Sequence, residues 1–144
     1  MICREVNRLL RKSQITNYKQ IQKIPMPENS KPYDLEERTY NFAVQCRDMV
    51  KRLAKTTPNL EYGRQLIRSS GSQAANYIEA NEALGKKDFA MRVKICRKET
   101  KESCLWLRLC DAGENSDLEQ ERLRLLKEAG ELRNIFTAIL RKAS

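Results

Sequence analysis

Apolar and small residues recur at alternating steps of four and three along this 144-residue chain. Such steps bring side chains to one face of an α-helix, which is the pattern of helices that pack in a bundle. In the first such stretch the positions are Leu35, Thr39, Phe42, Cys46, Met49 and Leu53. Two further stretches follow the pattern closely, at 89–110 and 118–139, and a looser one includes Leu66, Ile67, Tyr77 and Ile78. This spacing constrains the fold more than any other feature of the sequence.

Capping and breaking residues between these stretches predict four helices. The first is expected to run from an N-cap at Asp34 to a segment broken by Pro58, and the second from about residue 60 to 84, ended by Gly85. The third is expected over 87–110, and the fourth from a cap at Ser116 or Asp117 to about 142. Short connections make this an all-α, antiparallel up-down-up-down four-helix bundle over residues 34–144.

Residues 1–33 differ in character from the rest of the chain. Pro25, Pro27 and Pro32 exclude a continuous helix there, and the segment holds seven basic residues but only two acidic ones. We therefore predict a basic, mostly irregular N-terminal tail. Met26 offers a second translation start, so Met1 and Met26 both remain possible beginnings of the protein.

The composition excludes several classes of function. The chain has no histidine, and therefore no histidine base, nucleophile–histidine pair or histidine-ligated metal. It also lacks a Cys-x-x-Cys pair and a glycine-rich phosphate loop. With neither a secretory signal nor an apolar run long enough to cross a bilayer, the five cysteines indicate reduced thiols in the cytoplasm. We expect no catalysis, no cofactor, no metal and no membrane partner.

Charge points to a polyanionic partner. The 28 Lys and Arg residues outnumber the 19 Asp and Glu residues, giving a net charge of +9. Unmixed basic stripes lie on the third predicted helix and, more briefly, on the first: Lys94, Arg97, Lys101 and Arg108, then Arg47, Lys51 and Lys55. They are candidates for phosphate contacts with RNA or DNA, the alternative being solvated lysine-rich faces. No aromatic residues accompany them, so backbone or shape recognition is expected.

The third predicted helix has a second apolar side, nearly opposite its bundle seam. Met91, Ile95, Leu105 and Leu109 form it, and Trp106 lies between the two sides. A bundle helix needs one apolar side, so the second predicts an interface with another subunit; coverage by neighbouring helices or by the tail is the alternative. Lys98 and Glu102 are spaced to pair on this side. A polar network is also expected from Arg68, Asn76, Glu79, Lys98 and Glu99.

Four segments resemble a known family: YDLEERTYNFA (33–43), GRQLIRSSGSQAANYIEANEA (63–83), KKDFAMRVKICRKETKESCLWL (86–107) and ELRNIFTAIL (131–140). The family is that of four-helix-bundle proteins encoded in intervening sequences of bacterial 23S rRNA genes. A relative is the accessory variability protein of diversity-generating retroelements. The small-residue run leading into Ala75-Asn76-Tyr77 and Glu79-Ala80 is the most specific part. Cys96, Cys104 and Cys110 depart from the family, which usually has other residues there.

The resemblance implies a bacterial, non-enzymatic homopentamer. The accessory protein is similar in binding nucleic acid and a reverse transcriptase through a basic surface. We therefore expect a homo-oligomer that binds structured RNA or DNA through its basic stripes, with a reverse transcriptase as a possible protein partner. The alternative is a protein–protein interaction scaffold, or a mobile-element accessory protein without direct nucleic-acid binding.

Overall fold

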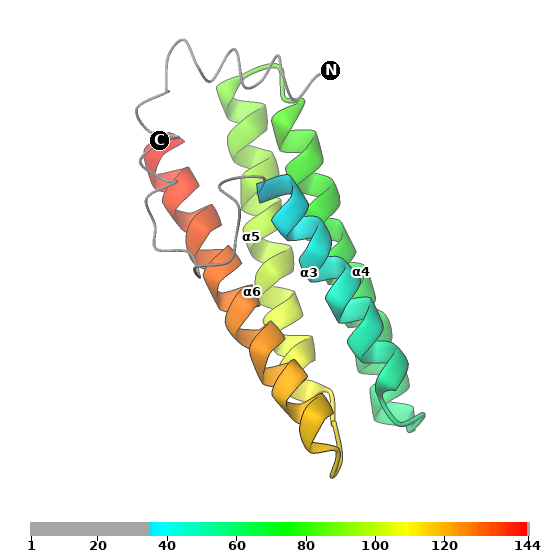
Figure 1. The fold of residues 1–144 in the computed structure, drawn as a ribbon. Coiled ribbons are helices and arrows are strands. Elements are labelled where there is room, and N and C mark those ends of the chain that lie inside the picture. The colour runs from blue at the N-terminus through cyan, green and yellow to red at the C-terminus, as the bar shows by residue number, and fades with distance from the viewer. Residues whose placement is uncertain (1–34, 144) are drawn as a thin grey trace.

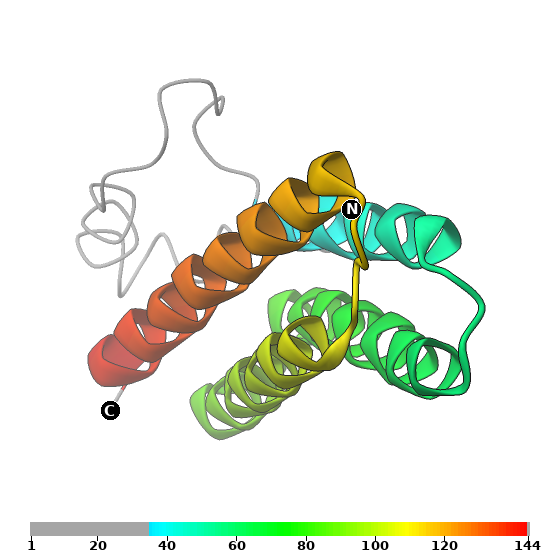
Figure 2. The ribbon, with the colours of Figure 1, turned by 90° about the horizontal axis from the view of Figure 1, so that it is seen from below.

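The computed structural model describes residues 35–143, which form four helices and, within that range, no strand. These are α3 (Leu35–Arg52), α4 (Thr57–Asn81), α5 (Lys86–Leu109) and α6 (Ser116–Ala143). Each helix packs against two neighbours, in the ring order α3, α4, α5, α6 (Figures 1 and 2). Successive helices run in opposite directions, so the predicted all-α up-down-up-down bundle is confirmed. The tail, Met26 and the predicted cap Asp34 lie outside the described residues.

The predicted seams form the core of the bundle. The buried apolar residues include Phe42, Cys46 and Met49 of α3, Val93, Cys96 and Leu107 of α5, and Leu125, Leu132 and Phe136 of α6. Tyr77 of α4 packs its ring against Phe136, with centroids 6.1 Å apart. The apolar period alone therefore identified the residues that hold the helices together.

Small residues let α4 lie close to its neighbours. The hydroxyl oxygens of Ser69 and Ser103 are 2.8 Å apart across the α4–α5 contact. On the α3 side, a Cβ added to Gly63 would lie only 2.9 Å from Cγ1 of Val50. Gly71, in contrast, is exposed and has open space around its Cα. The small-residue run thus permits close packing at some positions and leaves others at the surface.

Both predicted ends of the second helix and the predicted cap of the fourth are wrong. Thr56 caps α4 by accepting a hydrogen bond from the Asn59 amide at 3.3 Å, and Pro58 lies in the first turn, where its missing N–H does no harm. Gly85 precedes α5 in extended backbone, while α4 already ends at Asn81. Oδ1 of Asn115, rather than Ser116 or Asp117, accepts the amide of Leu118 at 3.1 Å.

A buried amide joins two connections at one end of the bundle. Nδ2 of Asn59 donates to the carbonyl oxygens of Ala54 at 3.1 Å and of Asp111 at 2.9 Å. Its Oδ1 accepts the amide of Asp111 at 2.9 Å. The α3–α4 and α5–α6 connections are therefore fixed to each other through one side chain.

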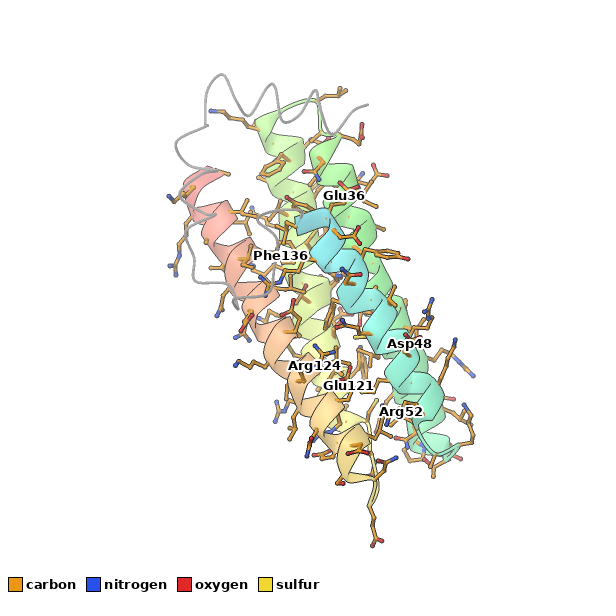
Figure 3. The ribbon with its side chains drawn as sticks, in the orientation of Figure 1. Glu36, Asp48, Arg52, Glu121, Arg124 and Phe136 are labelled. Carbon is orange, nitrogen blue, oxygen red and sulfur yellow. The ribbon has the colours of Figure 1, made fainter. Side chains whose placement is uncertain are left out.

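Polar contacts close the ring between α3 and α6. The Arg38 guanidinium contacts Glu128 at 2.6 Å and Glu131 at 2.7 Å. Lower on this edge, Arg124 donates to Gln45 at 3.0 Å and pairs with Glu121 at 2.7 Å (Figure 3). Burial lowers the pKa of Arg38, but the two carboxylates outweigh it and raise that pKa above its ordinary value.

Candidate functional site

The predicted cation row of α5 forms a surface of its own. Lys94, Lys101 and Arg108 are exposed and Arg97 is half-buried. Their steps of three, four and seven place them on one side of the helix, along about 21 Å at 1.5 Å per residue. None of the four forms an ion pair with any residue in the described range 35–143. We call Lys94, Arg97, Lys101 and Arg108 the α5 cation row.

Several arginines elsewhere on the bundle are paired with carboxylates. Arg122 contacts Glu119 at 2.6 Å, and Arg68 contacts Glu102 at 2.7 Å. Arg92 lies 3.9 Å from Asp88. The α5 cation row differs from these arginines because its positive charge has no such partner in the described chain.

Arg133 of α6 is exposed beside this row, and the sequence analysis missed it. Burial raises the pKa of the Cys104 thiol, while Arg133 and Arg108 both act to lower it. The side of α6 that carries Arg133 faces α5, because Arg122, three turns earlier on that side, donates to the Leu107 carbonyl oxygen at 2.9 Å. Arg133 also forms no ion pair within the described part of the chain. Its position depends on how α5 and α6 align, which no single-helix pattern contains.

The stripe predicted on α3 is wrong as a three-residue feature. The chain leaves the helix after Arg52, so Lys55 lies in the connection to α4. Arg47 pairs with its neighbour Asp48 at 3.0 Å. Lys51 is exposed in the last turn. The α5 cation row is consequently the stronger candidate for binding phosphate.

The second apolar side of α5 lies at the protomer surface. Met91, Leu105 and Leu109 are 51%, 45% and 40% exposed, and Ile95 is half-buried. Trp106 is half-buried and stacks on Tyr62 of α4, with ring centroids 6.1 Å apart. These aliphatic side chains therefore lie outside the protomer's own core, as a subunit interface requires. We call Met91, Ile95, Leu105 and Leu109 the α5 apolar patch.

Charged residues interrupt the α5 apolar patch at mid-height. Nζ of Lys98 lies 3.9 Å from Glu102, as the spacing predicted. Arg68 of α4 reaches the same carboxylate at 2.7 Å and lies 3.7 Å from the buried Glu99. Asn76 accepts a hydrogen bond from Arg92 at 3.3 Å, whereas the predicted member Glu79 is exposed and contributes no side-chain contact among the described residues. The predicted polar network is therefore right for Arg68, Lys98 and Glu99, which meet around Glu102, and wrong for Asn76 and Glu79.

A second apolar patch lies on α4, and the sequence analysis did not identify it as a surface. Leu60, Ile67 and Ile78 are exposed, although Ile67 and Ile78 were predicted to belong to the bundle seam. At about 100° per residue they point away from Ser69, which faces α5. The neighbouring positions Leu66 and Tyr77 fill the core instead. We call Leu60, Ile67 and Ile78 the α4 apolar patch.

Cys46, Cys96 and Cys110 are packing residues rather than reactive groups. Burial raises the pKa of Cys96 to about 12 and that of Cys110 to about 11, and it raises the pKa of Cys46 as well. Their thiols are therefore protonated at neutral pH. Within residues 35–143, no group of three cysteine or carboxylate side chains is arranged to hold a metal ion. No helix in that range is long and apolar enough to span a membrane.

Comparison with known proteins supports the fold. No protein-family model and no curated protein matches the chain. A solved structure from Bacteroides thetaiotaomicron VPI-5482 is similar, with a TM-score of 0.66 and 24% sequence identity. It is a protein of unknown function from the S23 ribosomal protein family, and the match covers 75% of this chain and 99% of that one. At this identity the likeness establishes the bundle architecture alone.

Proposed function

We propose that this protein is a non-enzymatic homo-oligomer that binds nucleic acid, structured RNA above all, through the α5 cation row. The observation that carries the proposal is the absence of any carboxylate partner for these four cations within residues 35–143. Each cation that neutralises a phosphate releases bound counterions, which favours binding at low salt. The net charge of +9 acts in the same direction.

The choice of RNA has separate support. The sequence resembles proteins encoded within bacterial 23S rRNA genes, and the similar solved structure is assigned to a ribosomal protein family. Both links lead us to propose a bacterial, cytoplasmic protein whose ligand is a folded transcript. The resemblance to the accessory variability protein supports a variant of this proposal, in which the protein serves a mobile element and has a reverse transcriptase as its partner.

A mobility-shift titration tests nucleic-acid binding. Structured ribosomal RNA fragments should bind at about 50 mM salt and dissociate steeply as salt rises to about 200 mM. Changing Lys94, Arg97, Lys101 and Arg108 together to Glu should abolish the shift. The matched control changes four other exposed cations, Arg52, Lys86, Lys87 and Lys127, to Glu and gives the same net charge. Equal loss in both variants, or no binding by the unaltered protein, contradicts the proposal.

For the assembly we propose a closed ring, with the homopentamer of the resembled family as its form. A ring needs two different surfaces on each subunit, whereas a two-fold dimer uses one surface twice. The α5 and α4 apolar patches provide two such surfaces, on different sides of the protomer. Exposed apolar groups of this kind mark sites of protein association.

Complementation of two interface variants tests the ring. Leu105→Lys with Leu109→Lys disables the α5 apolar patch, and Ile67→Lys with Ile78→Lys disables the α4 apolar patch. Each variant alone should be monomeric by light scattering, with its helix content unchanged. A mixture should form dimers, because one intact patch of each kind remains. A monomeric unaltered protein at micromolar concentration contradicts assembly, and a mixture that remains monomeric contradicts the ring.

A protein-interaction scaffold is the second candidate, favoured by the same exposed apolar patches. It predicts a protein partner that remains bound after nuclease treatment and at high salt. The scaffold would be supported over nucleic-acid binding if the variants of the α4 or α5 apolar patch lose this protein partner while the variant of the α5 cation row still binds it.

A further inference from the structure

We infer that the ligand is a double helix held by its phosphates alone, on a cationic surface that Arg133 of α6 completes. This inference rests on the proposed function and narrows it to one class of nucleic acid. It depends on two features of the structure: the second helix that contributes to the surface, and the position of the aromatic rings.

The cationic surface spans two helices. Arg122 of α6 donates to the carbonyl oxygen of Leu107 of α5 at 2.9 Å, and Arg133 lies eleven residues later, about three turns along the same side of α6. Packed helices lie about 8–10 Å apart, so the surface has width as well as length. The positive charge of Arg133 is available to a phosphate, because no carboxylate pairs with it within residues 35–143. The surface therefore suits a broad polyanion better than a single line of charge.

The aromatic rings of the described residues lie away from this surface. Trp106 and Tyr62 stack on each other on the α4 side of α5. Tyr77 and Phe136 are buried, and Phe89 packs against the core. The exposed Tyr40 belongs to α3, which is not a neighbour of α5. Among the described residues, the cationic surface thus has no aromatic platform of the kind that single-strand binders use.

A duplex meets both conditions. Its bases remain stacked inside, and its phosphates face outward at about one charge per 1.7 Å of helix axis. The α5 cation row, about 21 Å long, can therefore contact several phosphates without opening a base pair. Arg133 adds a contact on the α6 side of the same surface.

Three probes and one pair of variants test the inference. The probes are an RNA duplex and a DNA duplex of about 20 base pairs, and a thymine-only single strand with the same number of phosphates. Both duplexes should bind at least about tenfold more tightly than the single strand at about 50 mM salt. Arg133→Glu should weaken duplex binding about tenfold and reduce the slope of log affinity against log salt by about 1.

Lys127→Glu is the matched control, since Lys127 is an exposed, unpaired cation on another side of α6. It should leave duplex affinity within about twofold of the unaltered protein. The inference is overturned if the single strand binds as tightly as the duplexes, or if Arg133→Glu and Lys127→Glu have equal effects. In either case, loss of binding in the α5 cation row variant would still support the proposed function. No binding of any probe overturns both.

Discussion

At the residue scale, Gly63 shows how one missing side chain sets a helix contact. A Cβ at this position would meet Val50 at 2.9 Å, and the β-branched valine has little rotamer freedom in a helix. We expect Gly63→Ala to lower the free energy of unfolding by about 1 kcal/mol, because overpacking outweighs the gain in helix propensity. Urea denaturation followed by circular dichroism measures the change.

Gly130→Ala is the control for helix propensity, because open space surrounds Gly130 in the middle of α6. It should raise the free energy of unfolding by up to about 1 kcal/mol. Adding Val50→Ala to Gly63→Ala should restore part of the loss. An unchanged or stabilised Gly63→Ala variant would show that α3 and α4 can separate at no cost at this contact.

At the scale of helices and connections, Asn59 has the largest expected effect. Asn59→Ala removes three hydrogen bonds and leaves the Asp111 amide and two carbonyls to find other partners. We expect the free energy of unfolding to fall by about 2–4 kcal/mol. Thermal unfolding checks this, with Asn134→Ala as the control, since Asn134 is exposed and makes no side-chain hydrogen bond within the described residues. Equal stability of the two variants would contradict the role given to Asn59.

Helix interiors were predictable at this scale, whereas helix ends were not. The alternation of four and three steps depends on the chain alone, and it correctly identified Phe42, Met49, Leu125 and Leu132 as core residues. An end depends on which of several polar residues becomes the cap: Asn115 was passed over for Ser116 or Asp117, and no cap was named for the second helix, which Thr56 caps. Lys55 was counted with a basic stripe of the first helix, although the chain leaves α3 after Arg52.

At the scale of the whole molecule, acid should loosen the bundle. Hydrogen bonds from Arg124 hold the pKa of Glu121 below its ordinary 4.5, and Arg122 does the same for Glu119. A carboxylate whose pKa is lower in the folded state than in the unfolded state stabilises the fold at any pH above the unfolded-state pKa. This stability is lost as the pH falls through the folded-state pKa. The melting temperature should therefore drop below about pH 4.5.

Glu121→Gln should make that decline shallower, because the glutamine cannot take up a proton. Glu114→Gln is the control and should leave the decline unchanged. Glu114 is exposed in the α5–α6 connection and forms no ion pair among the described residues. Thermal melts at pH 3, 4, 5 and 6 compare the variants. Parallel curves for both variants would mean that the Arg124–Glu121 pair has no part in acid unfolding.

The surfaces were predictable only where one helix supplies them. The α5 cation row and the α5 apolar patch follow from residue spacing along a single helix, and the structure keeps both at the surface. Arg133 and the α4 apolar patch depend on how neighbouring helices are turned relative to each other. The assignment of Ile67 and Ile78 to the seam was wrong for this reason, since two adjacent positions competed for one place in the core.

The Asn59 hydrogen bonds have a consequence for how the molecule opens. Alternating helix directions place the start of α3, the end of α6 and the α4–α5 connection together at the opposite end of the bundle (Figure 1). There Nδ2 of Asn81, the last residue of α4, donates to the Glu36 carboxylate in the first turn of α3 at 2.9 Å. Asparagine side chains of α4 thus hold its neighbours at both ends of the bundle, so we expect the four helices to unfold as one cooperative unit.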